Sequence, residues 1–147
     1  MRNTLRILVL MPSLSLALFA QQPSSKIQDW IGWYRTPIQT PGKKNDRLLL
    51  TRGKEPGTIH VSGRAYWYGI NDVVHFGSVN ADGIPSGSSL HVVEGDDRDD
   101  PAACRIDFVL NPLDHTLSAE DNSHCGGMNV TFRGKWVRFT PATRPAK

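Results

Sequence analysis

The chain has 147 residues, 39% of them hydrophobic and 21% charged, and a formal net charge of +3. This length is sufficient for one domain with a single hydrophobic core. Arg2 and Arg6 lie at the extreme N-terminus, and without them the formal charge falls to +1. The basic balance therefore gives no support to a nucleic-acid-binding protein.

Residues 1–20 have the pattern of a signal peptide. A basic start is followed by the apolar runs Ile7–Leu10 and Leu14–Phe19, and then by small residues before the polar Gln21. A spanning helix needs roughly 20 apolar residues, so we expect no stable membrane span after cleavage. A retained N-terminal anchor is the alternative. No cysteine lies near the cleavage region, which excludes a bacterial lipoprotein anchor.

The remainder, residues 21–147, is expected to form a single β domain with its core over about 27–140, in the periplasm or outside the cell. It holds both cysteines, Cys104 and Cys125. In an oxidising compartment two cysteines most simply form one disulfide, and two free buried thiols are the alternative. A bridge closing a loop of this size is worth on the order of 3 kcal/mol in the chain-entropy model.

Short aromatic and aliphatic segments separated by turn residues predict strands in the first half of the chain. Ser25 is a candidate N-cap for one helical turn that ends at Gly32. The strands that follow are predicted at Trp33–Thr36, Arg47–Arg52, Thr58–Tyr68 and Val73–Val79. The third alternates clearly and has Ile59, Val61, Gly63, Ala65 and Trp67 on its expected core face. Gly63 marks either a bulge or a sharp coil of the sheet.

The second half contains a turn region at Asn80–Gly87, a strand at Ser88–Glu94 and a hairpin around Asn111–Asp114. Asparagine first and proline second suit a type I turn. This turn places Leu110 opposite His115, Phe108 opposite Leu117, Ile106 opposite Ala119 and Cys104 opposite Asp121.

In that register the chain must bend back after Asp121 before the disulfide can close. Gly126 and Gly127 are expected to supply the backbone freedom for the bend. The last strand is predicted at Met128–Phe139. Met128, Val130 and Phe132 share one face, whereas Val137 and Phe139 have the opposite parity. A bulge at Arg133-Gly134 would bring both sets to the inward side.

About eight short strands without a long amphipathic helix indicate an all-β fold. Sequential strands of this kind most easily form a single antiparallel up-and-down sheet. We therefore expect a small barrel, lipocalin-like or sandwich-like, with one disulfide.

Residues 121–134 form the pattern DNxxCGGMNVxFxG. This pattern resembles the closing signature of a family of small secreted bacterial β proteins. The layout is similar too, with a signal peptide, a Trp-Gly-like start, a middle strand pair and an upstream cysteine. Trp136 stands where the family pattern has a tyrosine, and the loops Pro37–Pro41 and Asp96–Asp100 are particular to this chain. The resemblance implies an exported β domain stabilised by a disulfide, and it implies no particular activity.

Residues that could carry out catalysis or bind a metal do not form a recognisable sequence motif. The acidic loop Glu94–Asp100 could offer oxygen ligands to Ca²⁺, but it lacks the EF-hand order and contains Arg98, so a solvated loop is the simpler interpretation. No G-x-S-x-G elbow is present. The histidines have no zinc-binding spacing, although those on neighbouring strands could converge: His60, His75, His91, His115 and His124. We expect no catalytic residue, metal or cofactor.

The outer face of the strand Thr58–Tyr68 is the predicted binding face. It combines aromatic rings with hydrogen-bonding groups, as protein and glycan partners require: His60, Arg64, Tyr66 and Tyr68. The main hypothesis is a non-enzymatic binding protein or inhibitor-like module that contacts an unidentified protein or glycan of the bacterial envelope. A lipocalin-like carrier of a small apolar ligand and an enzyme of unrecognised type are the alternatives.

Overall fold

The computed structural model describes residues 26–95 and 99–142. The predicted signal peptide, the candidate cap Ser25 and residues 96–98 of the acidic loop lie outside the described residues. The elements are α1 (Ile27–Trp30), β1 (Gly32–Arg35), β2 (Arg47–Arg52), β3 (Ile59–Tyr68), η1 (Ile70–Asp72), β4 (Val74–Gly83), β5 (Pro85–Ser86), β6 (Ser89–Val93), β7 (Arg105–Asn111), β8 (Thr116–Asp121) and β9 (Gly134–Phe139).

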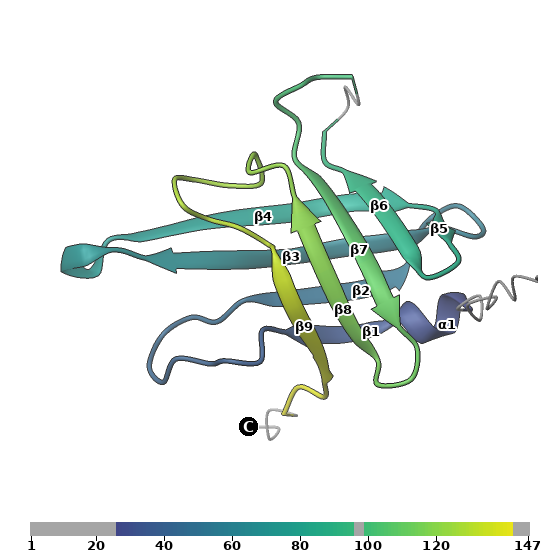
Figure 1. The fold of residues 1–147 in the computed structure, drawn as a ribbon, viewed down its shortest axis with the longest axis horizontal. Coiled ribbons are helices and arrows are strands. Elements are labelled where there is room, and N and C mark those ends of the chain that lie inside the picture. The colour runs from purple at the N-terminus through teal and green to yellow at the C-terminus, as the bar shows by residue number, and fades with distance from the viewer. Residues whose placement is uncertain (1–25, 96–98, 143–147) are drawn as a thin grey trace, which may run out of the picture.

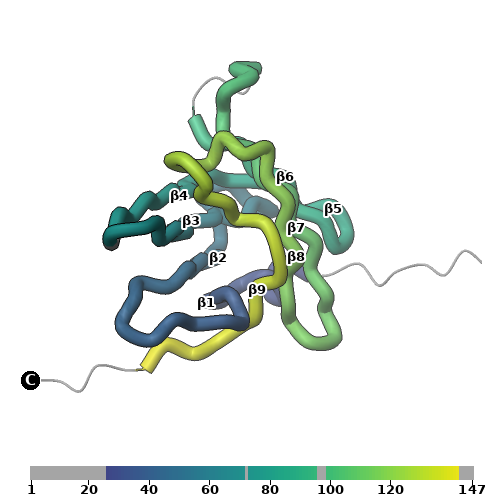
Figure 2. Tube along the Cα trace, turned by 60° about the vertical axis from the view of Figure 1, so that its left-hand side comes forward, coloured from purple at the N-terminus to yellow at the C-terminus, as the bar shows by residue number. Residues whose placement is uncertain are grey.

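All nine strands belong to one antiparallel sheet with the order β4-β3-β2-β1-β9-β8-β7-β6-β5 (Figure 1). Strands that follow one another in the chain are neighbours except β4 and β5, and β1 pairs with β9, so the sheet folds back on itself as Figure 2 shows. The predicted all-β antiparallel fold with one disulfide is confirmed. Among the described strands no backbone ladder joins β4 to β5 or β6, so the sheet is not closed into a barrel.

We call this interruption between β4 and β6 the seam. Three other contacts cross it. The backbone N–H of Asn80 donates to the Glu94 carboxylate, and a Cβ on Gly83 would collide with the carbonyl oxygen of His91. Gly77 lies against the backbone of Cys125 and Gly126. The two halves of the sheet are therefore held together across the seam without a continuous hydrogen-bonded ladder.

The interior is filled by large side chains from both halves of the sheet. Trp30, Tyr34, Phe108, Phe132 and Trp136 are fully buried. The Tyr34 hydroxyl donates to the carbonyl of Trp30, and the Trp136 indole N–H donates to the carbonyl of Phe132, so both polar groups are satisfied inside the core. Tyr34 and Trp136 thus add apolar burial without leaving an unpaired donor, whereas the buried indole N–H of Trp30 has no hydrogen-bond partner among the described residues.

Strand β3 has the core face that its alternation predicts. Ile59 and Val61 are fully buried, Ala65 is nearly so, and Trp67 packs against the edge of the core. Gly63 pairs in unbroken register with Leu48 and Val79, so it is not a bulge. A Cβ at Gly63 would collide with the carbonyl oxygen of Arg47, so the glycine permits a sharply coiled, close approach of β2 and β3.

The predicted register of the β7–β8 hairpin is wrong by two residues. Leu110 lies opposite Leu117, and Ile106 lies opposite Asp121. The loop between Asn111 and Thr116 is longer than the predicted turn, because the Asn111 side chain accepts from the N–H of Leu113 and His115 adopts a left-handed φ of 51°. A shift of two residues preserves the inward face, so the predicted core residues remain buried.

The prediction for the last strand is also wrong in part. Regular pairing begins only at Gly134, and Met128 is 74% exposed instead of sharing a buried face. Val130, Phe132 and Trp136 are all buried and have the same parity, so no bulge moves the inward set. Val137 and Phe139 are simply the outward side chains of β9.

Two further boundaries differ from the predictions. Strand β4 continues through residues 80–83, which were expected to be a turn, because each of them pairs with a residue of β3. Helix α1 begins after Lys26, whose backbone N–H donates to Asp29. In the parts of the chain that the structure describes, no helix has the length and apolarity needed to cross a membrane.

Candidate functional site

The four residues of the predicted binding face lie together on the outer side of β3, but they have different surroundings. Arg64 is exposed, whereas His60, Tyr66 and Tyr68 are half-buried. Arg64 and Tyr66 line one depression together with residues of the neighbouring strands β1 and β2. His60 lies further along the strand, where its Nδ1 is 2.6 Å from the Asp82 carboxylate. Only part of the predicted set therefore forms one surface.

Three arginines on neighbouring strands stand in one row across this surface. Arg35 of β1 lies directly opposite Arg47 of β2, and Arg47 lies opposite Arg64 of β3. The row ends at Val137 on one side and Ser78 on the other. Like charges placed directly opposite one another destabilise a sheet. A row of this kind is therefore a feature that packing alone does not explain.

Aromatic rings hold the guanidinium groups in place. The guanidinium carbons of Arg35 and Arg47 lie 5.0 Å and 5.9 Å from the centre of the Phe139 ring, and that of Arg64 lies 5.6 Å from the Phe76 ring. These are cation–π distances. Positive charge and exposed aromatic surface are thus arranged side by side on the sheet.

Further rings extend the same surface. Trp33 packs against Phe139 with ring centres 6.3 Å apart, and Tyr66 packs against Phe76 at 6.4 Å. Trp33 and Phe76 remain 37% and 57% exposed. We refer to the whole set as the arginine–aromatic face: Trp33, Arg35, Arg47, Arg64, Tyr66, Phe76 and Phe139.

The face is shallow. A depression of about 280 Å³ lies between β1, β2 and β3, with Trp33, Leu49 and Tyr66 in its lining. A second depression of about 280 Å³ begins at Arg47 and Tyr66 and is bordered by Lys43 and Lys44. Both are open, so the surface suits a broad partner better than an enclosed small molecule.

In the described part of the chain, no carboxylate neutralises the row. Among the residues that the structure describes, Arg35, Arg47 and Arg64 form no ion pair. The nearest carboxyl group in the sequence, that of Asp46, accepts a hydrogen bond from the N–H of Tyr66 at 2.8 Å. Burial raises the pKa of Asp46, and the hydrogen bond partly offsets this effect. The charge of the face is therefore strongly positive.

Sequence reasoning missed five residues of this face: Trp33, Arg35, Arg47, Phe76 and Phe139. Trp33 and Arg35 share the outer parity of a predicted strand, and so does Arg47 in the next, so the alternation contained part of the signal. The pairing of β1 with β9, which brings Phe139 beneath two arginines, joins residues more than one hundred positions apart. Local periodicity cannot supply that contact.

Histidine–aspartate pairs occur at the opposite end of the sheet. His91 Nδ1 lies 2.7 Å from Asp107, as His60 does from Asp82, and both pairs are partly exposed. A depression of about 310 Å³ has Asp82 and His91 in its lining. In the described ranges no group of three or more histidine, cysteine, aspartate or glutamate side chains could hold a metal ion. Within residues 26–95 and 99–142, no serine or cysteine side chain is hydrogen-bonded to either histidine.

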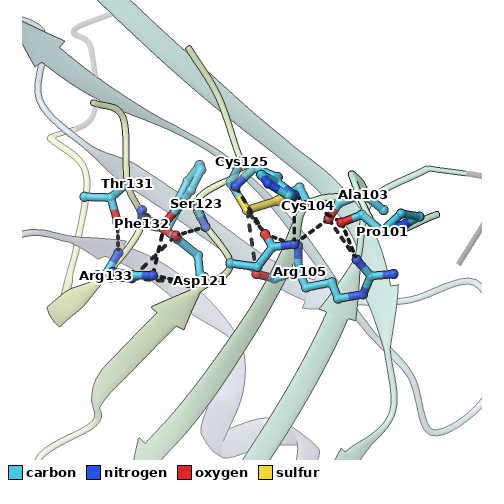
Figure 3. The surroundings of a disulfide bond; sticks show 12 residues. Pro101, Ala103, Cys104, Arg105, Asp121, Ser123, Cys125, Thr131, Phe132 and Arg133 are labelled. Atoms are coloured by element: carbon cyan, nitrogen blue, oxygen red, sulfur yellow. Dashed lines mark hydrogen bonds and ion pairs between the residues drawn. A yellow bond between two sulfur atoms is a disulfide. The ribbon is translucent and has the colours of Figure 1, made fainter. Parts of the chain in front are cut away.

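The disulfide Cys104–Cys125 is buried and joins α-carbons 4.5 Å apart (Figure 3). Beside it the buried carboxylate of Asp121 accepts hydrogen bonds from Thr131 Oγ1 at 2.7 Å and from the N–H of Phe132 at 2.6 Å. It also accepts from the N–H of Ser123 at 2.8 Å. One carboxylate thus organises both ends of the segment between β8 and β9.

The glycine pair in this segment works differently from the prediction. The left-handed conformations belong to Ser123 and Asn129, with φ of 65° and 66°, and not to Gly126 or Gly127. A Cβ on Gly126 would lie 2.7 Å from the α-carbon of Gly77, so this glycine permits a close approach to β4. The residues of the DNxxCGGMNVxFxG pattern that contact one another here have structural roles.

No protein-family model, no curated protein and no solved structure matches this chain. The interpretation of the arginine–aromatic face therefore depends on its own geometry and chemistry.

Proposed function

We propose that the protein is an exported, non-enzymatic binding protein of the bacterial envelope that engages an acidic partner protein through the arginine–aromatic face. The observation that carries this proposal is the row Arg35–Arg47–Arg64, whose members are cross-strand neighbours. The mutual repulsion of the row is relieved when a partner supplies carboxylates. An acidic surface would therefore gain both the direct ion pairs and the relief of this repulsion.

The residue types favour a protein partner over a small ligand. Tryptophan, tyrosine and arginine dominate the energetically important positions of protein interfaces. The planar guanidinium group bonds carboxylates in a bidentate way, and it is already oriented here by Phe139 and Phe76. The shallow depressions give side chains of a partner a place to pack without enclosing a whole molecule.

Other observations support the remaining parts of the proposal. The disulfide is typical of exported proteins, and residues 1–20 have the pattern of a signal peptide. The resemblance of residues 121–134 to small secreted bacterial proteins points the same way. A carrier would need an apolar cavity, and the interior between the sheet halves is occupied by residues such as Trp30 and Phe132.

The test is binding of the mature protein to immobilised poly-L-glutamate and to proteins of a periplasmic extract. Arg64→Glu should reduce both kinds of binding by tenfold or more, since it reverses one charge of the row. Lys54→Glu makes the same change in net charge in the exposed β2–β3 turn and should leave binding intact. The captured protein, identified by mass spectrometry, should have an acidic surface.

Equal capture by wild type and Arg64→Glu would contradict the proposal. A different result would indicate an anionic glycan as the partner instead of a protein. In that case wild type captures peptidoglycan fragments but does not bind poly-L-glutamate, and Arg64→Glu loses the capture of the fragments.

A further inference from the structure

A second row of outward side chains lies beside the arginine row, and it is largely apolar. Trp33 of β1 pairs with Phe139 of β9 on one side and with Leu49 of β2 on the other, and Leu49 pairs with Ser62 of β3. Each of the strands β1, β2 and β3 carries one residue of this second row and, two positions away, one arginine. Residues two positions apart in a strand point to the same side, so the positive row is bordered by apolar surface.

The guanidinium groups of Arg47 and Arg64 lean away from each other, although these residues are cross-strand neighbours. The guanidinium carbon of Arg47 lies 5.9 Å from the centre of the Phe139 ring on β9, whereas that of Arg64 lies 5.6 Å from the centre of the Phe76 ring on β4. Strands β9 and β4 lie on opposite sides of the pair β2 and β3 in the sheet order. The two aromatic contacts therefore leave the surface between these arginines open.

The depression of about 280 Å³ lies at this opening. Its lining combines Trp33, Leu49 and Tyr66 with Arg47 and Arg64. Trp33 is 37% exposed, and Leu49 and Tyr66 are half-buried, so a partner can reach their apolar atoms. Sites for small molecules enclose roughly 300–1,000 Å³. An open depression at the lower limit of this range has room for one large side chain better than for a whole ligand.

We propose that this depression receives one large apolar side chain, such as phenylalanine or leucine, from a segment of the acidic partner that carries carboxylates on both sides of it. This inference rests on the proposed function, because it specifies the segment that the arginine–aromatic face recognises. The apolar side chain packs against Trp33, Leu49 and Tyr66. Arg47 and Arg64 bond the flanking carboxylates, for which the planar guanidinium group is well suited.

The two kinds of contact reinforce each other. Energetically important interface positions are side chains held in a pocket and surrounded by contacts that exclude water. Carboxylate–guanidinium pairs at the rim shield the apolar contact from water, and the loss of water strengthens the charge pairs. A polyanion without an apolar side chain gains only the charge pairs. Selectivity for an apolar residue between acidic residues therefore distinguishes this site from a purely electrostatic surface.

The experiment measures, by fluorescence anisotropy, binding of the full mature protein to two labelled peptides of equal charge. Each peptide has four glutamates on either side of a central residue, which is phenylalanine in one and alanine in the other. Wild type should bind the phenylalanine peptide about tenfold more tightly. Binding to immobilised poly-L-glutamate is measured in parallel.

Two variants locate the apolar contact. Ser62 lines the depression, so Ser62→Phe fills it without altering an arginine and should bind the two peptides equally. Leu49→Ser makes the lining more polar and should reduce the preference to less than about threefold. Ser118→Phe makes the same change as Ser62→Phe at an exposed outer position of β8, and it should keep the tenfold preference. Circular dichroism and the melting temperature verify folding, and if one of the first two variants is unfolded, the other decides.

The outcomes separate this inference from the proposed function. Equal binding of the two peptides by wild type, with poly-L-glutamate binding retained, would overturn the inference and leave the proposed function standing. Absence of binding to poly-L-glutamate and to both peptides would overturn the two together. A preference for the phenylalanine peptide that persists in Ser62→Phe and in Leu49→Ser would place the apolar contact elsewhere and would also overturn the inference.

Discussion

Charge reversal at the centre of the arginine row should stabilise the protein. Arg47 has a like charge on each side, Arg35 on β1 and Arg64 on β3. The variant Arg47→Glu converts two cross-strand repulsions into two attractions. Most surface substitutions in a sheet are neutral or destabilising, so a gain in stability from an exposed charge reversal is a specific consequence of this arrangement.

The expected gain follows from the pair energies. A cross-strand charge pair is worth roughly 0.2–1 kcal/mol, and reversal of the charge changes its sign, so two pairs contribute roughly 1–4 kcal/mol. Loss of the cation–π contact between Arg47 and Phe139 removes about 0.5–1 kcal/mol. The lower β propensity of glutamate removes a few tenths of a kcal/mol more. The net gain should be about 1 kcal/mol, or roughly 4 °C in melting temperature.

The assay is urea unfolding of oxidised, mature protein at low ionic strength, repeated in about 1 M salt, where the Debye length is about 3 Å. The gain should shrink in high salt because the pairs are exposed. Arg47→Gln removes the repulsion without adding attraction, and it should show about half the gain. Lys54→Glu lies outside the row and should show none.

A variant Arg47→Glu that is less stable than wild type at low salt, or a gain that is independent of salt, would refute this reasoning. It would mean that the three guanidinium groups do not interact as cross-strand neighbours. The same variant is expected to lose poly-L-glutamate binding, so stability and binding should change in opposite directions.

Three further predictions concern stability. Replacing Cys104 and Cys125 by serine should lower the free energy of unfolding by about 3 kcal/mol, measured by chemical denaturation. Asp121→Asn turns an amide N–H toward one of the three donors that the buried Asp121 carboxylate now accepts from, and it should cost about 3 kcal/mol. Glu120→Gln, with its exposed side chain, should change stability by less than about 0.5 kcal/mol. Burial raises the pKa of Asp46 in the folded protein above its ordinary value of 3.8. The protonated carboxyl therefore stabilises the folded state below pH 3.8, and this stabilisation is lost as the pH rises through the folded-state pKa. Asp46→Asn should therefore be more stable than wild type at neutral pH, and the difference should vanish in acid; a variant that is less stable at neutral pH would contradict this sign.

The sequence predicts which residues face inward much better than it predicts which residues meet. The alternation in β3 identifies Ile59, Val61 and Ala65 as core because a strand has a side-chain period of two. That period is the same for registers that differ by two residues, so the β7–β8 pairing was predicted wrongly while its buried face was right. The deciding detail is the loop, where His115 takes a left-handed conformation that its residue type does not require.

The candidate site shows the same limit. Arg64 and Tyr66 were visible on a single alternating strand, whereas the arginine row exists only because β1, β2 and β3 are neighbours. The β1–β9 pairing then adds Phe139. Residue type and parity can be read from one strand, but the repulsion that singles out the row is a property of three strands in register.

The seam gives the disulfide a role beyond closing a loop. Strand β4 is terminal in the sheet order, and an uncovered terminal strand is a template on which another chain can add. At Gly77 the inward face of β4 lies against the backbone of Cys125 and Gly126, which the bridge to Cys104 holds in place. Reduction frees this segment, so we expect a reduced chain to expose more of β4 than an oxidised one. The bridge would then protect the terminal strand from pairing with another chain as well as tightening the fold.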